Sequence, residues 1–527
     1  MKQYFRSGVG VIGVVLLLVG ASRIKEYPSP NAQAGQPLIA QAIAQRPATQ
    51  TISNTEFAHH LDQLIDQSPF ARARWGVKVV SVSNGATIYE RNARQQFIPA
   101  SNMKIYTTAT ALELLGADFR WRTSVYVVAQ PDANGTVDGD LILYGRGAPD
   151  LVGEAAENSL EKLAEAVHAR GIRRVKGAVI GDESYFRGSS LGDGWQWNDM
   201  QWYFGAEASA LSVNGNEIDL NLLPAAKADA TPEVRVAERL GHVQIENRMA
   251  PGNRAQRSTI GVSRGLSDNR VEVWGELAPG ANGFGVRLSV HNPALWAAKI
   301  FAAALKARNI SVDGETFSRS FRTAPSQRFD PSKATEIAAV TSSPLSTIAT
   351  ITNKESNNLY AELILRTLGR ERRSMLSTAE PPGRELGDDE AGTELIKLWL
   401  GRNGVASADT ALHDGSGLSR LNLVTPDSAT QLLTAVARSG NRPFRESLPV
   451  AGQDGTLRGR LKTIAGRAYA KTGSLIYVNS LSGYVITTNG ETLAFSIFCN
   501  DYTGRGNSAR LIDEIVIGLS GYPKTVR

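Results

Sequence analysis

Apolar residues recur along the first folded part of the chain at two different spacings. In residues 53–67 they lie three or four positions apart, at Phe57, Leu61, Leu64 and Ile65. This spacing predicts an amphipathic helix. Residues 75–82 are strand-like, and the turn pair Asn84-Gly85 connects them to residues 86–89, which predicts a β-hairpin. A helix, a hairpin and then a further helix predict an α+β fold with a largely antiparallel sheet.

The further helix begins close to Ser101. Pro99 ends the preceding segment, and small or apolar residues continue to Leu115 before Gly116. This pattern predicts a helix whose C′ position is the glycine. Ser101 and Lys104 lie three positions apart on one face of this helix, and the helix N-terminus favours a developing anion. The segment therefore contains a candidate serine nucleophile beside a lysine.

Lys104 can act as a base only while its amine is neutral. Burial and a nearby second cation both lower the pKa of a lysine. The S-x-x-K pattern also occurs at residues 22–25 and 159–162, and a helix start with a solvated lysine is the ordinary explanation of any single match. The second cation has to come from another part of the chain.

Short alternating runs separated by Gly, Asp and Asn extend from residue 122 to residue 290. They predict an inserted, mainly β region in which residues 154–170 form a clear helix. Residues 293–308 return to a strong helical pattern. We therefore expect residues 53–121 and 291–527 to form one domain, and residues 122–290 to form one or more inserted subdomains.

Ser356 and Asn358 lie where a helix that begins near residue 344 gives way to a second helix at residues 359–368. On a helix junction that faces a cleft, they could supply a hydroxyl relay and an amide that binds a substrate carbonyl. The S-x-N pattern taken alone favours a helix cap instead.

The sequence Lys471-Thr472-Gly473 lies in a strand-like segment that further antiparallel strands and a final helix follow. On a strand, Lys471 and Gly473 share one face, and at a strand end the glycine lets a substrate backbone lie close. Lys471 is the best candidate for the second cation.

Residues 1–27 contain a cationic start, an apolar run and small residues that suit cleavage. This pattern predicts a signal peptide and export of the protein, and an uncleaved segment would leave an N-terminal membrane anchor. Residues 28–52 are rich in Ala, Gln and Pro, which predicts a linker.

Composition excludes several classes of function. The formal net charge of +6 is spread along the chain without a basic stripe, so we expect no nucleic-acid partner. The single cysteine, Cys499, can form no internal disulfide. The six histidines show no metal-ligand spacing, so we expect neither a metal nor a cofactor.

Three motifs occur in a fixed order, Ser101-x-x-Lys104, Ser356-x-Asn358 and Lys471-Thr472-Gly473. In combination they resemble the active-site motifs of penicillin-binding proteins and serine β-lactamases. The large insertion and the loop at residues 414–420 most resemble the D-alanyl-D-alanine carboxypeptidase/endopeptidase family, the class C low-molecular-mass penicillin-binding proteins. The resemblance implies a transpeptidase-like fold, an antiparallel sheet flanked by helices.

The resemblance also implies roles for the motif residues. Ser101 would be acylated by the penultimate D-alanine carbonyl, with Lys104 as its base. Ser356 would relay the proton to the leaving amine, and Asn358 would orient the substrate amide. Lys471 would help to keep Lys104 neutral.

The resemblance also implies roles for further residues, from their positions in or near the motifs. Thr472 would bind the terminal carboxylate of the substrate together with the lysine of its motif, beside Gly473. The backbone N–H of Ser474 would complete an oxyanion hole with that of the nucleophile. Three residues would lie near the pocket for the stem-peptide side chain, namely Asp182, Arg420 and Leu475, although a turn explains the first equally well and core packing the last.

The implied substrates are peptidoglycan stem peptides ending in D-Ala-D-Ala and their cross-links, with β-lactams as covalent inhibitors. The implied location is the periplasm or cell envelope. The sequence leaves open the balance between carboxypeptidase and endopeptidase action.

Three alternative functions are considered for this sequence. A wall-binding or scaffolding protein could keep the fold without strong catalysis. A β-lactamase shares the motifs but is generally much shorter, and the sequence identifies no base for rapid deacylation. An α/β-hydrolase would use G-x-S-x-G at residues 188–192 or 261–265, yet neither lies between an apolar strand and a helix.

Overall fold

The computed structural model describes the chain from residue 54 to residue 522, except for short gaps at residues 153–157, 228, 253–258, 377–384, 406 and 504–505. The predicted signal segment at residues 1–27 and the predicted linker at residues 28–52 lie outside the described residues. Within the described ranges, no helix combines the length and the apolar character needed to cross a membrane.

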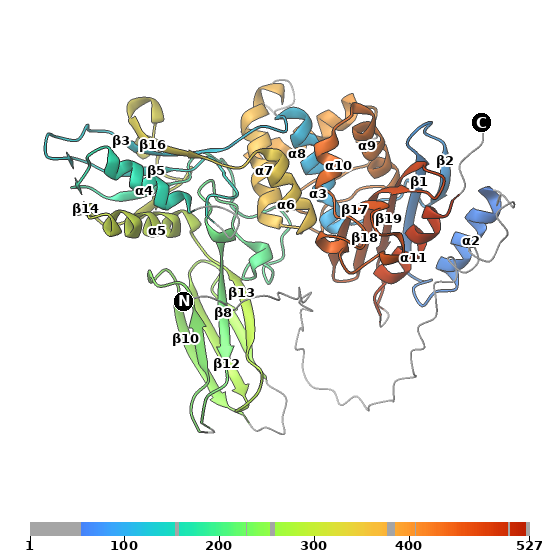
Figure 1. Cartoon of the computed structure of the whole chain (residues 1–527), viewed down its shortest axis with the longest axis horizontal. Coiled ribbons are helices and arrows are strands. Elements are labelled where there is room, and N and C mark those ends of the chain that lie inside the picture. The colour runs from blue at the N-terminus through green and yellow to red at the C-terminus, as the bar shows by residue number, and fades with distance from the viewer. Residues whose placement is uncertain are drawn as a thin grey trace.

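One end of the molecule is a five-stranded antiparallel sheet that joins the beginning and the end of the chain (Figure 1). Its strands, in spatial order, are β17 (Ala468–Leu475), β18 (Val478–Ile486), β19 (Thr492–Asn500), β1 (Arg74–Ser81) and β2 (Thr87–Arg91). The central strands are buried along nearly their whole length. The predicted hairpin is confirmed as β1 and β2, and the predicted antiparallel sheet is confirmed.

Helices cover both faces of this sheet. The predicted first helix is α2 (Asn54–Asp66), and it shares an apolar core with α11 (Ala509–Ser520) on one face. The helix α9 (Pro426–Ser439) packs against the sheet within the other large core. The sheet is therefore the middle layer of three, which fixes the positions of its strand ends.

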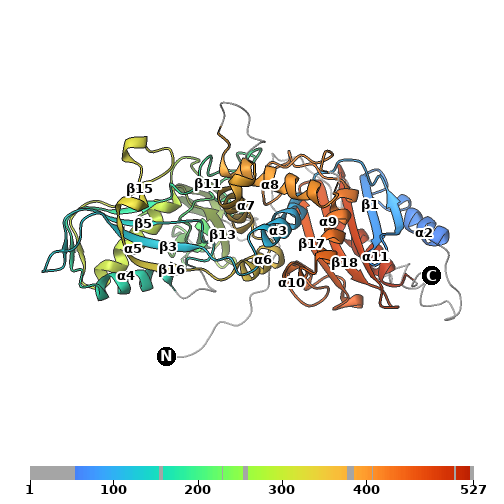
Figure 2. The same cartoon turned by 90° about the horizontal axis from the view of Figure 1, so that it is seen from above.

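A group of helices lies between this sheet and the inserted region, as both views show (Figure 2). It consists of α3 (Met103–Leu114), α6 (Leu345–Lys354), α7 (Asn358–Arg372), α8 (Asp388–Arg402) and α10 (Arg442–Ser447). Helix α3 packs against α6 and α7. All the residues of α3 from Met103 to Leu112 are buried, so it is the central helix of this group.

The inserted region contains a mixed five-stranded sheet and two helices. The sheet has the order β15 (Phe317–Arg319), β7 (Val179–Asp182), β5 (Leu141–Tyr144), β3 (Arg122–Val127) and β16 (Thr335–Thr341). Helices α4 (Ser159–Ala169) and α5 (Pro293–Ala307) pack against each other and against this sheet. A small parallel sheet of β14 (Ser311–Val312), β6 (Arg174–Val175) and β4 (Thr136–Val137) lies beside it.

Strand pairing extends the inserted region beyond residue 290, where the alternation pattern predicted its end. The strand β16 pairs antiparallel with β3, and α5 packs on β7. We propose that the insertion runs from residue 122 to residue 341 and that the parent domain resumes at α6. With these bounds the insertion includes α5 and the late strand β16, which complete its sheet.

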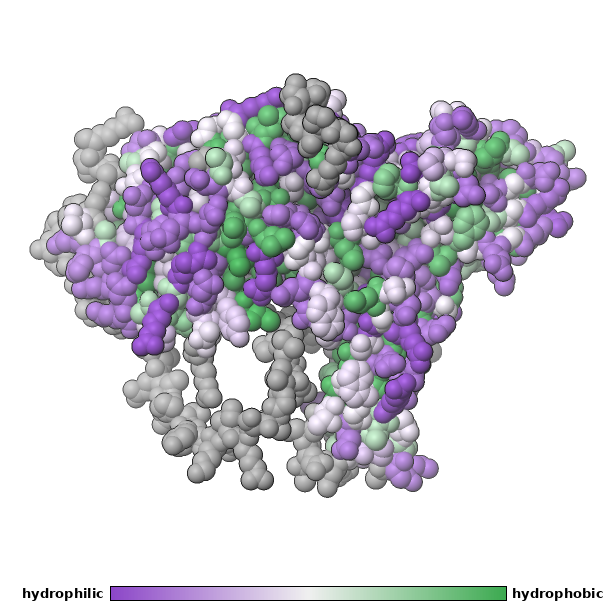
Figure 3. Space-filling model, turned by 180° about the vertical axis from the view of Figure 1, so that it is seen from behind, coloured by the Kyte–Doolittle hydropathy of each residue, from purple (hydrophilic) through white to green (hydrophobic). Residues whose placement is uncertain are grey.

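Two three-stranded sheets form an arm that projects from the insertion (Figure 1). One contains β8 (Glu217–Leu223), β9 (Glu233–Val236) and β13 (Phe284–Ser289), and the other β10 (Gln244–Pro251), β11 (Gly261–Arg264) and β12 (Arg270–Leu277). On the face seen in Figure 3, polar residues cover most of the surface and apolar residues form scattered patches, so this face is mainly hydrated.

Candidate active site

Ser101 lies in a single 3₁₀ turn, Ala100–Asn102, that leads directly into α3. Ala100 has a positive φ of 48° although it is a fully buried, non-glycine residue. The Ser480 hydroxyl of β18 holds the turn by donating a 2.7 Å hydrogen bond to the carbonyl of Pro99. The predicted helix start is therefore a tight turn that the sheet holds against its edge, and Ser101 is partly exposed on it.

Lys104 is fully buried on the first turn of α3. Its Nζ lies 3.0 Å from Ser101 Oγ, 2.6 Å from Asn358 Oδ1 and 2.7 Å from the carbonyl oxygen of Ser416. Burial lowers the pKa of Lys104 to about 7, and the carboxylates of Asp414 and Glu362 oppose this shift. A lysine with this pKa spends much of its time as a neutral amine at physiological pH.

Ser356 and Asn358 lie at the break between α6 and α7, and the sequence predicted a helix junction at this position. The residue that caps α7 is Asn357, whose side chain accepts a hydrogen bond from the Tyr360 N–H. Ser356 itself has a positive φ of 60°. The helix cap is therefore Asn357, and the side chains of Ser356 and Asn358 are both available to the site.

Lys471 is fully buried on β17, and its Nζ donates hydrogen bonds to Ser356 Oγ at 2.9 Å and to the Thr472 carbonyl at 2.8 Å. Burial lowers its pKa well below that of a free lysine, and the charge of Lys104 adds to this effect. The structure thus brings the three motifs together through two lysine–side-chain contacts, Lys104 with Asn358 and Lys471 with Ser356.

Gly473 lets β17 lie against the turn that contains Ser101, because a Cβ at position 473 would lie 2.6 Å from the Pro99 carbonyl oxygen. Thr472 Oγ1 donates a 2.8 Å hydrogen bond to the hydroxyl of Thr456, in a second loop beside the strand. Ser474 is exposed, and its hydroxyl donates to Asn479 Oδ1 at 2.8 Å. These residues form one continuous edge beside Ser101.

Arg420 and Leu475 lie near the turn that follows β17. The guanidinium of Arg420 donates to the carbonyl of Ile476 at 3.2 and 3.3 Å. Leu475 is half-buried and belongs to none of the apolar core clusters of the described residues, so core packing does not explain it. Leu475 is the last residue of the strand that carries the third motif, and Arg420 contacts the turn that follows this strand.

Asp182 has different surroundings from the other candidates. Its carboxylate accepts a 2.9 Å hydrogen bond from the Ser184 N–H and lies 3.9 Å from Arg319 in the inserted sheet. The side chain is fully buried, and none of these partners belongs to the motif residues. The bond to the residue two positions on is an Asx turn, which is the structural alternative that the sequence left open.

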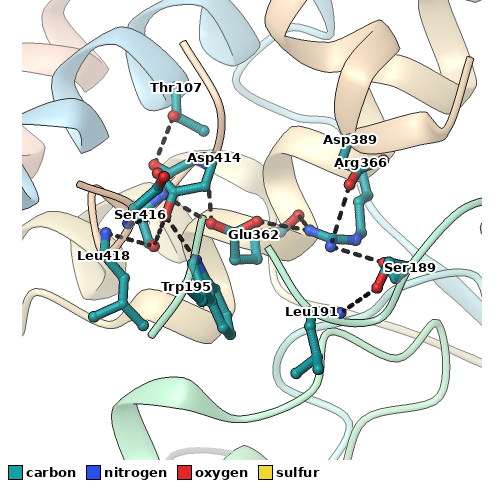
Figure 4. Close-up of polar contacts among 12 residues, drawn as sticks. Thr107, Ser189, Leu191, Trp195, Glu362, Arg366, Asp389, Asp414, Ser416 and Leu418 are labelled. Carbon is teal, nitrogen blue, oxygen red and sulfur yellow. Dashed lines mark hydrogen bonds and ion pairs between the residues drawn. The ribbon is translucent and has the colours of Figure 1, made fainter. Parts of the chain in front are cut away.

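A buried charged cluster beside Lys104 was missed by the sequence reasoning (Figure 4). Glu362 and Arg366, one turn apart on α7, form an ion pair of 2.6 Å, and their side chains are 0% and 1% exposed. Asp414 is also fully buried, in the loop at residues 414–420. The available signal was an acid and a base four positions apart in the mainly apolar stretch of residues 359–368. Among the described residues, no group of histidine, cysteine and acidic side chains is arranged to hold a metal.

The helix-covered antiparallel sheet, the serine in the turn before α3, the lysine on α3 and the lysine on β17 define the class of active-site serine enzymes with the DD-peptidase fold. The sequence model of the D-Ala-D-Ala carboxypeptidase 3 (S13) family matches residues 57–519. The chain belongs to this family. The predicted family, fold class and enzyme class are therefore confirmed.

Individual relatives agree with this assignment. The D-alanyl-D-alanine carboxypeptidase of Actinomadura sp. (strain R39) is 34% identical over 486 residues, which cover 89% of this chain and 85% of the relative. The penicillin-sensitive carboxypeptidase A of Dictyostelium discoideum is 27% identical, with 85% and 87% covered. The crystal structure of penicillin binding protein 4 from Haemophilus influenzae superposes with a TM-score of 0.76 at 25% identity, covering 88% of this chain and 99% of that one.

Proposed function

We propose that this protein is a penicillin-sensitive serine D-Ala-D-Ala carboxypeptidase and endopeptidase in which Ser101 forms the acyl-enzyme. The observation that carries the proposal is the buried Lys104 amine, 3.0 Å from the Ser101 hydroxyl. A serine becomes an effective nucleophile when an adjacent base removes its proton. The family and the named relatives support the substrate class.

The surroundings of Lys104 explain how a neutral amine would be oriented. Its two remaining N–H groups would donate to two carbonyl oxygens, those of Asn358 at 2.6 Å and Ser416 at 2.7 Å. The lone pair is then directed to the third neighbour, the Ser101 hydroxyl. In the first step the Ser101 proton passes to Lys104 Nζ while Oγ attacks the penultimate D-alanine carbonyl carbon.

The second pair of motif residues suits departure of the terminal D-alanine. The leaving amine needs a proton when the C–N bond breaks, and we assign its delivery to the Ser356 hydroxyl. Lys471 holds that hydroxyl at 2.9 Å and supplies positive charge when protonated. Water then attacks the ester carbonyl of the acyl-enzyme, and the shortened peptide leaves with Ser101 restored.

The edge position of β17 suits an extended peptide substrate. This strand is the last of its sheet, and an isolated bridge between Tyr469 and Val450 occupies only the start of its outer side in the described residues. A stem peptide can add to such an edge through main-chain hydrogen bonds. The N–H groups of Ser101 and Ser474 would then face the oxyanion, and Thr472 with Lys471 would bind the terminal carboxylate.

We further propose that Arg420 and Leu475 contact the rest of the stem peptide, because they flank the turn after β17. Asp182 would contribute only after a rearrangement that exposes its carboxylate. The same acyl-enzyme serves free stem peptides and cross-links, and β-lactams would form it irreversibly. The substrate places the enzyme in the periplasm or cell envelope, with residues 1–27 directing export or anchoring the chain in the membrane.

The test is covalent labelling of the full-length protein with a fluorescent penicillin, followed by mass mapping of the labelled peptide. We expect label on the Ser101 peptide, and none in Ser101→Ala. The matched control is Ser159→Ala, which removes the serine of the S-x-x-K pattern at residues 159–162 and should label like the wild type. A folded wild-type protein that takes no label would contradict the proposal and favour a wall-binding role.

A further inference from the structure

The loop at residues 414–420 reaches Lys104 through one peptide unit. The Ser416 carbonyl of that unit accepts a 2.7 Å hydrogen bond from Lys104 Nζ. The N–H of the same unit, which belongs to Gly417, donates a 2.8 Å hydrogen bond to Asp414 Oδ1. The Asp414 carboxylate and the Lys104 amine are therefore joined by a single peptide group, with its negative end at the amine.

The Asp414 carboxylate is held by five donors and has no exposure to solvent. Besides Gly417, these are Asn422 Nδ2 at 2.6 Å, Ser416 Oγ at 2.8 Å, the Ser419 N–H at 3.0 Å and Trp195 Nε1 at 2.9 Å. Five donors around one buried carboxylate satisfy its oxygens and fix its orientation. The orientation of the peptide unit is fixed as a consequence.

The indole of Trp195 comes from the inserted region, more than two hundred positions earlier in the chain (Figure 4). The insertion also reaches the site through the Phe204 carbonyl, which accepts a 2.9 Å hydrogen bond from Asn358 Nδ2. The Phe204 contact therefore orients the Asn358 amide, whose oxygen lies against Lys104, and the Trp195 contact holds the carboxylate that binds the Ser416–Gly417 peptide. The inserted region takes part in building the base, in addition to any role of its outer surface.

Glu362 holds the other side of the loop. Its Oε1 accepts hydrogen bonds from the N–H groups of Gly415 and Ser416, both at 2.9 Å, while Oε2 pairs with Arg366. Arg366 in turn donates to the Ser189 carbonyl of the inserted region at 3.0 Å. Two buried carboxylates thus bind the loop by its N–H groups, which leaves its carbonyl oxygens directed at α3, toward Lys104 and Thr107.

We propose that Asp414 is a positioning residue for Lys104 that acts through the Ser416–Gly417 peptide, and that Trp195 of the inserted region holds Asp414 in place. The negative carboxylate polarises the peptide and makes the Ser416 carbonyl a stronger acceptor. A stronger acceptor keeps one N–H of Lys104 away from Ser101, so that the lone pair faces the hydroxyl. This inference rests on the proposed function, because it assigns Lys104 the role of base.

The charges that face Lys104 decide how the pH profile responds. The carboxyl groups of Asp414 and Glu362 oppose the lowering of the Lys104 pKa by burial, and burial raises the pKa of Glu362, which pairs with Arg366. Lys471 faces Lys104 from β17. Removing the charge of Asp414 disfavours the ammonium form of Lys104. The acid limb of the acylation rate should then move to lower pH, whereas damage to packing alone would lower the rate at every pH equally.

The experiment measures the rate of acylation of the full-length protein by a fluorescent penicillin from pH 5 to pH 9. We expect Asp414→Asn to move the midpoint of the acid limb down by about one pH unit and to lower the plateau. Trp195→Phe keeps the charge and removes one donor, so we expect its plateau to fall by about tenfold. The matched control is Trp75→Phe, which removes an equally buried indole hydrogen bond of 2.9 Å in β1.

Circular dichroism and thermal unfolding establish which variants are folded. A folded Asp414→Asn protein with an unchanged midpoint would overturn the inference. Equal acylation rates for Trp195→Phe and Trp75→Phe would also overturn the inference. If Asp414→Asn does not fold, this comparison is the test of the inference. A wild-type protein that is not acylated at all would overturn the proposed function itself. This outcome differs from failure of the inference alone, in which the wild-type protein is still acylated.

Discussion

The Nζ of Lys104 lies 2.6 Å from Oδ1 of Asn358, although 254 positions separate the two residues in the chain. This contact joins α3, the helix that follows Ser101, to the helix junction that carries the second motif. It also makes the protonation of Lys104 sensitive to any charge placed at position 358. Two predictions about pH dependence follow from this geometry.

The rate of acylation by a β-lactam should rise with pH through about pH 7. Burial lowers the pKa of Lys104 to about 7, so the amine is protonated below this value and cannot accept the Ser101 proton. Above it the neutral amine predominates and the rate should reach a plateau. Acylation kinetics of the wild-type protein between pH 5 and pH 9 test this, and a rate that falls as pH rises through 7 would contradict it.

Asn358→Asp should move the acid limb of that profile to higher pH by about one to three units. The new carboxylate would lie against Lys104 Nζ, stabilise the ammonium form and raise the lysine pKa. Acylation should be slow at pH 7 and recover toward pH 9. The matched control is Asn357→Asp, which adds the same charge one position earlier and retains an N-cap residue for α7. Equal profiles for the two variants would argue against a direct effect on Lys104.

Replacing Ser356 should separate activity from stability. Both Ser356→Ala and Ser356→Gly remove the hydroxyl that Lys471 holds, so each should lower turnover of a D-Ala-D-Ala peptide by about a hundredfold or more. The residue has a φ of 60°, which glycine adopts without strain. Ser356→Gly should therefore be more stable than Ser356→Ala by about 1 kcal/mol. Thermal midpoints of the two variants measure the difference, and full turnover in either would reject the relay role.

Gly417→Ala should disrupt the site far more than a similar change elsewhere. Gly417 has a φ of 83°, and a Cβ there would overlap the carbonyl oxygen of Ala100 beside the nucleophile. We expect a cost of about 3 kcal/mol and loss of acylation. The matched control is Gly440→Ala, at a φ of 75° with no atom within 4 Å of the added Cβ, which should cost about 1 kcal/mol. Similar losses in thermal midpoint for the two variants would show that backbone strain, rather than steric overlap, accounts for the loss of stability.

Local features of the fold were predictable from the sequence. The periodicity of residues 53–67 predicted α2, the Asn84-Gly85 turn predicted the β1–β2 hairpin, and the run ending at Gly116 predicted α3. These elements depend on neighbours within a few positions, which a pattern records directly. The order of the three motifs, the large insertion and the loop at residues 414–420 together were enough to predict the family, because each motif is short and continuous.

Other features depend on contacts between distant parts of the chain. The pairing of β16 with β3 lengthens the insertion, and it joins two strands more than two hundred positions apart. Asp182 belonged to the same group of candidates as Arg420, yet its partners lie in the inserted sheet. The strand pairing has no local signal, because any strand of suitable composition can pair with several others. For Asp182 the local signal was the turn with Ser184, and only the structure showed that the carboxylate is buried beside Arg319.

The sequence by itself determined which residues could do the chemistry, since Ser101, Lys104, Ser356, Asn358 and Lys471 all lie in its three motifs. Only the tertiary structure decided how the base is held. Asp414 and Trp195 act on Lys104 through a buried peptide unit, and the chain that supplies them is far from α3 in sequence. The physical reason is that burial and hydrogen-bond direction, which set the pKa and the lone-pair orientation of an amine, exist only after distant segments have packed together.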